Sequence, residues 1–171
     1  MFDISRSAAR AAGILAAPAL FCLPTAALAD TASSTLNVSA TVTANCTVST
    51  SPIAFGTVNP LSGTNVDAAG GITVTCTNGT DWEASAGVGG GSGASFAARR
   101  MAAGTDLLNY NLYTNAARTS VWGDGSGTTV VVSNTGTGSA QPVTIYGRVG
   151  SGQTAVPPGS YADTVAVTVT Y

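Results

Sequence analysis

The sequence contains no histidine and no lysine, and charged side chains make up only 8% of its 171 residues. The common general bases, Schiff-base amines and imidazole-activated nucleophiles of enzymes are therefore missing from the chain. The six basic residues are all arginines. So few cations argue against nucleic acid or an anionic membrane surface as a partner, because both are bound by basic patches.

The first 29 residues have the pattern of a secretory signal peptide, so we expect residues 1–29 to be removed. Arg6 and Arg10 precede an apolar run at 11–23, and small residues at 27–29 fit a cleavage site. The run is shorter than the roughly 20 residues that span a bilayer, although a retained N-terminal anchor stays an alternative. Cleavage leaves 142 residues, a one-domain length, with four arginines and seven acids for a net charge of −3.

Only two cysteines, Cys46 and Cys76, remain after this cleavage. An even pair in an exported protein most simply predicts one disulfide. A metal site or a reactive thiol is the alternative, but both lack a supporting histidine or neighbouring base, and we expect neither a metal nor a cofactor. A disulfide between positions 30 apart would stabilise the fold by roughly 3–4 kcal/mol in the chain-entropy model.

Helix-forming stretches are scarce, whereas short alternations rich in Thr and Val, separated by turn residues, are typical of an all-β sandwich or barrel. We expect one helical turn at 95–103, and a loop at the glycine-rich stretch 87–93, which matches no phosphate-binding motif. The predicted inward side chains of the second and third core strands are Ile72, Val74, Cys76, Trp82 and Ala84. The core strands are predicted at 46–55, 71–77, 80–86, 107–114, 129–133, 142–149 and 164–171.

Two segments, 34–44 and 164–171, place apolar residues at every second position. We interpret the later one as the open edge of an unfinished sheet, and the earlier one as a strand that completes that sheet in another copy. The pattern fits equally an ordinary strand of the chain's own domain, and the residues leave both interpretations open. The apolar face of the earlier segment is Leu36, Val38, Ala40, Val42 and Ala44, and that of the later one is Val165, Val167, Val169 and Tyr171.

Four further sets of residues suggest other chemistry or contacts. Asp81 and Glu83 share one face of a predicted strand and could form a hydrolase dyad, although two solvated acids are far commoner. Trp122 could stack a sugar, which would make the chain a self-contained secreted glycan-binding module. Asp124 begins only a fragment of a calcium loop, so we expect a turn there. Arg148 lies near the end of the penultimate strand and is predicted to pair with Asp163 across the sheet.

Short motifs in a consistent order cover residues 45–171. The chain resembles the spore coat protein U domain family, which includes subunits of archaic chaperone–usher pili. The motifs are N-C-T-V at 45–48, F-G at 55–56, I-T-V-T-C-T-N-G-T at 72–80, R-x-M at 99–101, L-N-Y-N-L-Y at 108–113, V-W-G-D-G at 121–125, Y-G-R-V at 146–149 and P-G-S-Y-A-D-T-V-x-V-T-V-T-Y at 158–171.

The resemblance implies an incomplete immunoglobulin-like β-sandwich that lacks its final strand and is completed by donor-strand complementation. Residues 30–44 would be the donor extension and 45–171 the pilin domain, with Cys46 and Cys76 bridging the first two strands. A periplasmic chaperone, an outer-membrane usher and further pilin subunits would be the partners. We therefore expect a non-enzymatic subunit of a surface pilus or spore-coat-like fibre, exported through the periplasm, that supports adhesion or biofilm formation.

Overall fold

The computed structural model describes residues 28–171, and the predicted signal peptide falls almost wholly outside this range. The described residues contain eight strands and no helix. The strands are β1 (Cys46–Ser51), β2 (Val66–Cys76), β3 (Asp81–Ala86), β4 (Arg99–Ala103), β5 (Asp106–Tyr113), β6 (Val132–Thr135), β7 (Gln141–Val149) and β8 (Val167–Thr170).

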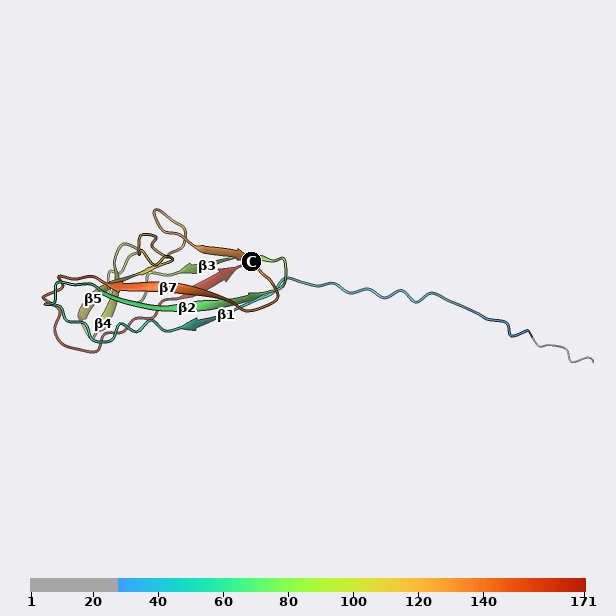
Figure 1. The fold of residues 1–171 in the computed structure, drawn as a ribbon, viewed down its shortest axis with the longest axis horizontal. Coiled ribbons are helices and arrows are strands. Elements are labelled where there is room, and N and C mark those ends of the chain that lie inside the picture. Colours follow the sequence, from blue (N-terminus) through green and yellow to red (C-terminus); the bar gives the residue numbers. More distant parts are fainter. Residues whose placement is uncertain (1–27) are drawn as a thin grey trace, which may run out of the picture. The chain divides into compact units, whose positions relative to one another are not determined.

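The strands form two antiparallel sheets, which confirms the predicted all-β class. One sheet has the order β1-β2-β7-β5-β4, and the other has the order β6-β3-β8. Figure 1 shows the long strands β2 and β7 side by side; they pair from Val66↔Val149 to Val74↔Gln141. Neighbours in the sheets are mostly far apart in sequence, so the fold depends on non-local pairing.

The core lies between the two sheets and is built from the inward positions of the alternating strands. As predicted, the second and third strands contribute Ile72, Val74, Cys76, Trp82 and Ala84, all 3% exposed or less. From β5 come Leu108, Tyr110 and Leu112, and β7 adds Ile145 and Val149. Burying a large apolar side chain of this kind stabilises the fold by about 1.5–3 kcal/mol, so this face of each strand fixes its register.

The helical turn expected at 95–103 is wrong, because Arg99–Ala103 forms β4. This strand pairs with β5 from Arg99↔Tyr110 to Ala103↔Asp106. The connecting turn begins at Gly104, which has a φ of +65°, a conformation that glycine adopts without strain. The alanines of this stretch have only a weak preference against strand structure, and pairing with a hairpin partner overcomes it.

Several predicted strand ends also shift. The first strand stops at Ser51 instead of residue 55, and the last runs only over Val167–Thr170. Pro52 follows β1 directly and has no N–H to continue the ladder with β2. After it, residues 52–55 cross the inner face of the five-stranded sheet. The second strand starts earlier than predicted, at Val66, and β6 starts later, at Val132.

Two glycines on the inner face make this crossing possible. A Cβ at Gly147 would lie 2.7 Å from the Phe55 ring, and one at Gly70 would lie 2.5 Å from the Pro52 carbonyl oxygen. Since both positions lack a side chain, Ile53 and Phe55 can pack directly onto the sheet. This packing sets one side of the cavity described below.

The predicted pair between Arg148 and Asp163 is wrong. Arg148 instead donates two hydrogen bonds to the carboxylate of Asp67, its cross-strand neighbour on β2, at 2.7 and 2.8 Å. Arg118 adds a second ion pair to Asp67 at 3.2 Å. The register places Asp67 opposite Arg148, whereas Asp163 lies in the segment before β8.

The hydrogen bonds from Arg148 lower the pKa of Asp67 below its ordinary value. A lowered folded-state pKa gives stability that is present above about pH 3.9 and is lost as the pH falls through the lowered value. We expect Asp67→Asn to reduce the free energy of unfolding by about 0.5–1 kcal/mol at pH 7, since the pair is partly exposed. Chemical denaturation from pH 7 to pH 2 should show this difference shrinking to zero. Asp106→Asn, which removes no ion pair within residues 28–171, is the matched control.

Candidate functional site

The two sheets each leave one strand edge open on the same side of the sandwich. Within residues 28–171, β8 pairs with β3 from Glu83↔Thr170 to Ala86↔Val167, and it has no second partner. Likewise β1 pairs only with β2. An edge strand exposes a row of unsatisfied N–H and C=O groups that can accept another strand.

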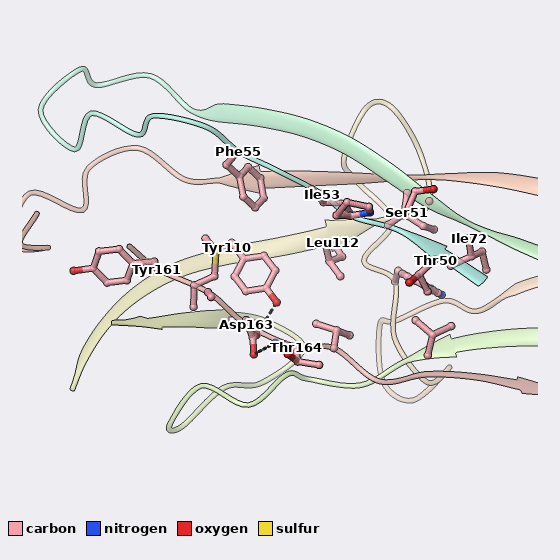
Figure 2. A pocket seen from close by; sticks show the side chains of 18 residues that line it. Thr50, Ser51, Ile53, Phe55, Ile72, Tyr110, Leu112, Tyr161, Asp163 and Thr164 are labelled. Carbon is pink, nitrogen blue, oxygen red and sulfur yellow. Dashed lines mark hydrogen bonds between the residues drawn. The ribbon is translucent and has the colours of Figure 1, made fainter. Parts of the chain in front are cut away.

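A cavity of about 420 Å³ lies between these edges. Figure 2 shows Thr50, Ser51, Ile53 and Phe55 along one side and Tyr161, Asp163 and Thr164 along the other. A second cavity of about 650 Å³ shares Ile53, Phe55, Met101 and Tyr161 with the first and continues along residues 56–60 and 156–160. We call the two cavities together the groove.

The floor of the groove is the hydrophobic core itself. It includes Leu112, Trp122 and Ile145, which are buried yet line the first cavity. The Phe55 and Tyr110 rings face each other with centroids 6.1 Å apart in an edge-to-face arrangement (Figure 2). A ligand in the groove would therefore meet mainly apolar and aromatic atoms, with backbone groups of β8 and β1 at its sides.

The four residues predicted to edge an acceptor groove do not all lie at this cavity. Val165 and Val167 line it, and Val169 is half-buried further along β8. Tyr171 follows the strand, is 56% exposed and lines a different hollow. The alternation Val165-Val167-Val169 is thus the part of the pattern that faces the core side of the groove.

Asp163 is a polar group in the groove wall whose contacts the sequence did not reveal. Its carboxylate accepts hydrogen bonds from the Tyr110 hydroxyl at 2.7 Å and the Gly90 N–H at 2.7 Å. The backbone N–H of Thr164 adds a third at 2.8 Å. Burial, and then the bond to Asp163, raises the pKa of Tyr110 above its ordinary value, so the phenol stays protonated and donates.

Arg99 is fully buried beneath the floor of the groove, with 0% of its surface exposed. Its guanidinium donates to the carbonyl oxygens of Gly87 and Trp122 and to Asn111 Oδ1, at 2.6–2.9 Å. Burial lowers its pKa, but an arginine remains charged in proteins. The carbonyl and amide acceptors compensate this cation and fix Trp122, which lines the cavity. Sequence reasoning missed this role because the three acceptors come from distant segments.

Trp122 does not form the predicted sugar-stacking surface. It is 2% exposed, and its Nε1 donates to the Ala84 carbonyl oxygen at 3.0 Å. The indole is therefore not exposed at the protein surface to stack a sugar. The Trp122 backbone forms a short parallel bridge with Val130 just before the Gly123-Asp124 turn.

The two acidic candidates lie away from the groove. Asp81 and Glu83 are exposed on the outer face of β3, where they line a shallow hollow of about 490 Å³ with Ser133, Thr135 and Tyr171. Asp81 accepts a hydrogen bond from the Thr135 hydroxyl at 2.6 Å. Asp124 accepts from Ser126 N–H at 2.9 Å, which is the geometry of a turn.

The segment before β1 contains no strand between residues 28 and 45. The side chains of Leu36, Val38 and Val42 are 88%, 85% and 84% exposed. Residues 34–44 therefore do not form an ordinary strand of their own domain. Large apolar side chains in a strictly alternating, unpaired segment are a liability in water unless a partner covers them.

The predicted disulfide is confirmed. Cys46 and Cys76 are bonded to each other and occupy directly opposite positions of β1 and β2. The neighbouring residues reinforce this junction, since Asn45 and Thr77 exchange backbone and hydroxyl hydrogen bonds. The start of β1 is thus anchored to the end of β2 just after the unpaired segment.

Comparison with known proteins identifies the family. A profile described as the Spore Coat Protein U domain matches residues 32–168. The chain belongs to this family. The resemblance drawn from the sequence motifs is thereby confirmed. A curated relative, "Protein U" of Myxococcus xanthus, is 36% identical over 158 residues, which covers 84% of this chain and 87% of that protein.

Among solved structures, the fold is similar to a chain in a complex from Acinetobacter baumannii. That complex joins the chaperone CsuC to the tip adhesion subunit CsuE of archaic chaperone–usher Csu pili before assembly. The TM-score is 0.56 at 21% identity, over 77% of this chain but only 40% of that one. This likeness concerns the fold alone, and it confirms the predicted immunoglobulin-like sandwich.

Within residues 28–171 the structure contains no helix long and apolar enough to span a membrane.

Proposed function

We propose that this chain is a structural subunit of an exported surface polymer, in which residues 34–44 of one copy fill the groove of the next. The observation that carries the proposal is the open edge of β8 beside an apolar groove, together with an exposed, alternating segment in the same chain. In this proposal, the groove accepts one more strand, and residues 34–44 become that strand when they bind to another copy. Family membership supports this pairing.

The dimensions and chemistry of donor and groove are compatible. The edge of the groove runs from residue 161 to Thr170 at the end of β8 and is ten residues long. The proposed donor at 34–44 is eleven residues long. A strand presents alternate side chains to one face, so Leu36, Val38 and Val42 would reach the apolar floor together, with Ala40 between them. The polar face, Ser39 and Thr41 included, would remain in water.

The energetics favour a long-lived joint. Burying Leu36, Val38 and Val42 would contribute about 1.5–3 kcal/mol each. Each backbone hydrogen bond to the edge of β8 would add about 1 kcal/mol. Part of this gain offsets the conformational entropy that an extended segment loses when it becomes ordered. A large net binding free energy remains, because the groove already exists.

The partners follow from the same proposal. Other copies or related pilin subunits would supply donor strands, and a periplasmic chaperone would cover the groove before assembly. The likeness to a subunit found in a chaperone complex supports this step, and an outer-membrane usher would then export the polymer. We propose a fimbrial location at the cell surface, in support of adhesion or biofilm formation. Nothing favours a glycan-binding module, since the aromatic residue on which that alternative depended is buried.

The test compares residues 30–171 with a deletion variant that starts at residue 45. The longer chain, purified without a chaperone, should form oligomers, and the deletion variant should remain monomeric with a lower unfolding midpoint. A peptide of sequence 34–44 should bind the deletion variant and raise that midpoint by more than 10 °C, the scale of several kcal/mol for a domain of this size. A monomeric longer chain, together with a deletion variant of equal stability, would exclude the proposal.

A further inference from the structure

One wall of the groove is a segment that crosses from one sheet to the other. Ala162 exchanges two backbone hydrogen bonds with Ala102 of β4, at 2.9 and 3.1 Å, so it belongs to the five-stranded sheet. By Val167 the same chain has joined β3 in the three-stranded sheet. Residues 163–166 span the gap between the sheets, and residues 163–165 line the groove where neither sheet holds them as a strand.

Two attachments hold this crossing segment. Gly87 N–H donates to the Ala166 carbonyl oxygen at 2.9 Å. The stronger attachment is the Asp163 carboxylate, whose Oδ2 accepts from the buried Tyr110 hydroxyl in the groove floor and whose Oδ1 accepts from Gly90 N–H in the loop behind the wall. Figure 2 shows the hydrogen bond between Tyr110 and Asp163 as a dashed line. Bonds of this kind, to an ionised carboxylate, are stronger than neutral ones.

The loop is shaped to receive this carboxylate. Gly89 has a φ of +89°, and a Cβ at this position would collide with Asp163 Oδ2. At Gly90 a Cβ would instead lie 3.6 Å from Asp163 Oδ1, an ordinary contact, and its φ is not positive. The backbone therefore approaches the carboxylate closely at one glycine and leaves room at the next.

We propose that Asp163 is a positioning residue that holds the 163–166 wall away from the facing segment 50–55, so that the groove stays open before a donor arrives. This inference rests on the proposed function of the groove. The hydrophobic effect favours closure of an empty apolar groove, because closure removes the exposed floor from water. The Asp163 carboxylate, which we call the latch, opposes that closure. It ties the wall to the floor through Tyr110 and to the loop through Gly90. Once a donor strand is bound, the donor itself separates the two walls, and the latch is no longer needed.

The experiment measures binding of a fluorescent peptide of sequence 34–44 to the chain 30–171 that carries Val38→Asp, which disables its own donor segment. Adding Asp163→Ala to this parent should slow peptide association by about tenfold or more, the effect of losing a charge-assisted hydrogen bond. The dissociation rate and the unfolding midpoint of the peptide-bound form should stay near those of the parent. A purely structural role for Asp163 would lower the midpoints of the empty and filled forms equally.

Four further variants separate the positioning role of Asp163 from general damage to the fold. Asp163→Asn keeps an acceptor for the Gly90 N–H and should restore most of the association rate. Gly89→Ala displaces the carboxylate and should slow association as Asp163→Ala does. Gly104→Ala, which has a similar positive φ but meets nothing within 4 Å, controls for backbone strain. Gly90→Ala should bind at the parental rate.

If Asp163→Ala fails to fold, Tyr110→Phe serves in its place, since it removes only the hydroxyl that Asp163 accepts from. Unchanged association rates in these variants, or equal effects of Gly89→Ala and Gly104→Ala, would overturn the positioning role alone. A parent chain that does not bind the peptide would overturn the proposed function, and this inference would fall with it.

Discussion

Val38→Asp is expected to abolish assembly of the purified chain while leaving its own fold unchanged. Val38 is 85% exposed and lies outside every strand, so a carboxylate there costs the monomer nothing. In the proposed polymer, the same carboxylate would enter a groove floored by Leu112, Trp122 and Ile145, whose lining residues include no arginine. Burying an unpaired charge costs several kcal/mol, which corresponds to a loss of at least 10³-fold in the stability of the joint.

Size-exclusion chromatography and electron microscopy of chains 30–171 would measure this effect, with a parallel assay for chaperone binding, which should persist. Ser39→Asp is the matched control, because it adds the same charge one residue away on the face that would point to solvent. It should assemble like the unmodified chain. Polymer yield in Val38→Asp equal to that of Ser39→Asp would count decisively against residues 34–44 as the donor strand.

Removal of the disulfide is expected to have the largest effect on stability. Cys46 and Cys76 close a loop of 30 residues, and β1 otherwise has one neighbour and mostly exposed side chains. The double variant Cys46→Ala/Cys76→Ala should lose roughly 3–4 kcal/mol of unfolding free energy, since the unfolded chain is no longer restricted. Because β1 leads into residues 50–55 of the groove, the double variant should also bind the 34–44 peptide more weakly.

Urea unfolding followed by tryptophan fluorescence would measure this loss, since Trp82 and Trp122 are both buried in the core. The unmodified chain treated with a thiol reductant is the control and should show the same midpoint as the double variant. An unchanged midpoint would mean that the pairing of β1 with β2 is sufficient without the covalent link.

Much of the fold could be predicted because one face of several strands is buried. In β2, β3 and β5 buried apolar residues recur at every second position, from Ile72 to Cys76, from Trp82 to Ala86 and from Leu108 to Leu112. The disulfide was predictable for a different reason: only two cysteines lie outside the predicted signal peptide. Local patterns fail where a residue's environment is set by distant segments, as for β4, whose alanines are compatible with helix or strand until the hairpin with β5 forms.

For the groove as well, one side could be predicted from the local sequence and the other could not. The alternation of Val165, Val167 and Val169 indicated an exposed edge near the end of the chain, but the opposite wall was not visible in the sequence. That wall exists because Pro52 ends β1 and because Gly70 and Gly147 allow Ile53 and Phe55 to pack on the sheet. Three residues distant from one another in sequence therefore decide where the cavity opens.

Residue types and their local spacing are enough to predict the all-β class, the disulfide, the family and the apolar face of residues 34–44. The three-dimensional fold was needed to show that Trp122 is buried, that Arg148 pairs with Asp67, and that Asp163 bonds to Tyr110 and Gly90. These contacts join residues 38 to 81 positions apart. Which polar group meets which partner depends on strand order and register, and these are set by the packing of the whole core and not by any single segment.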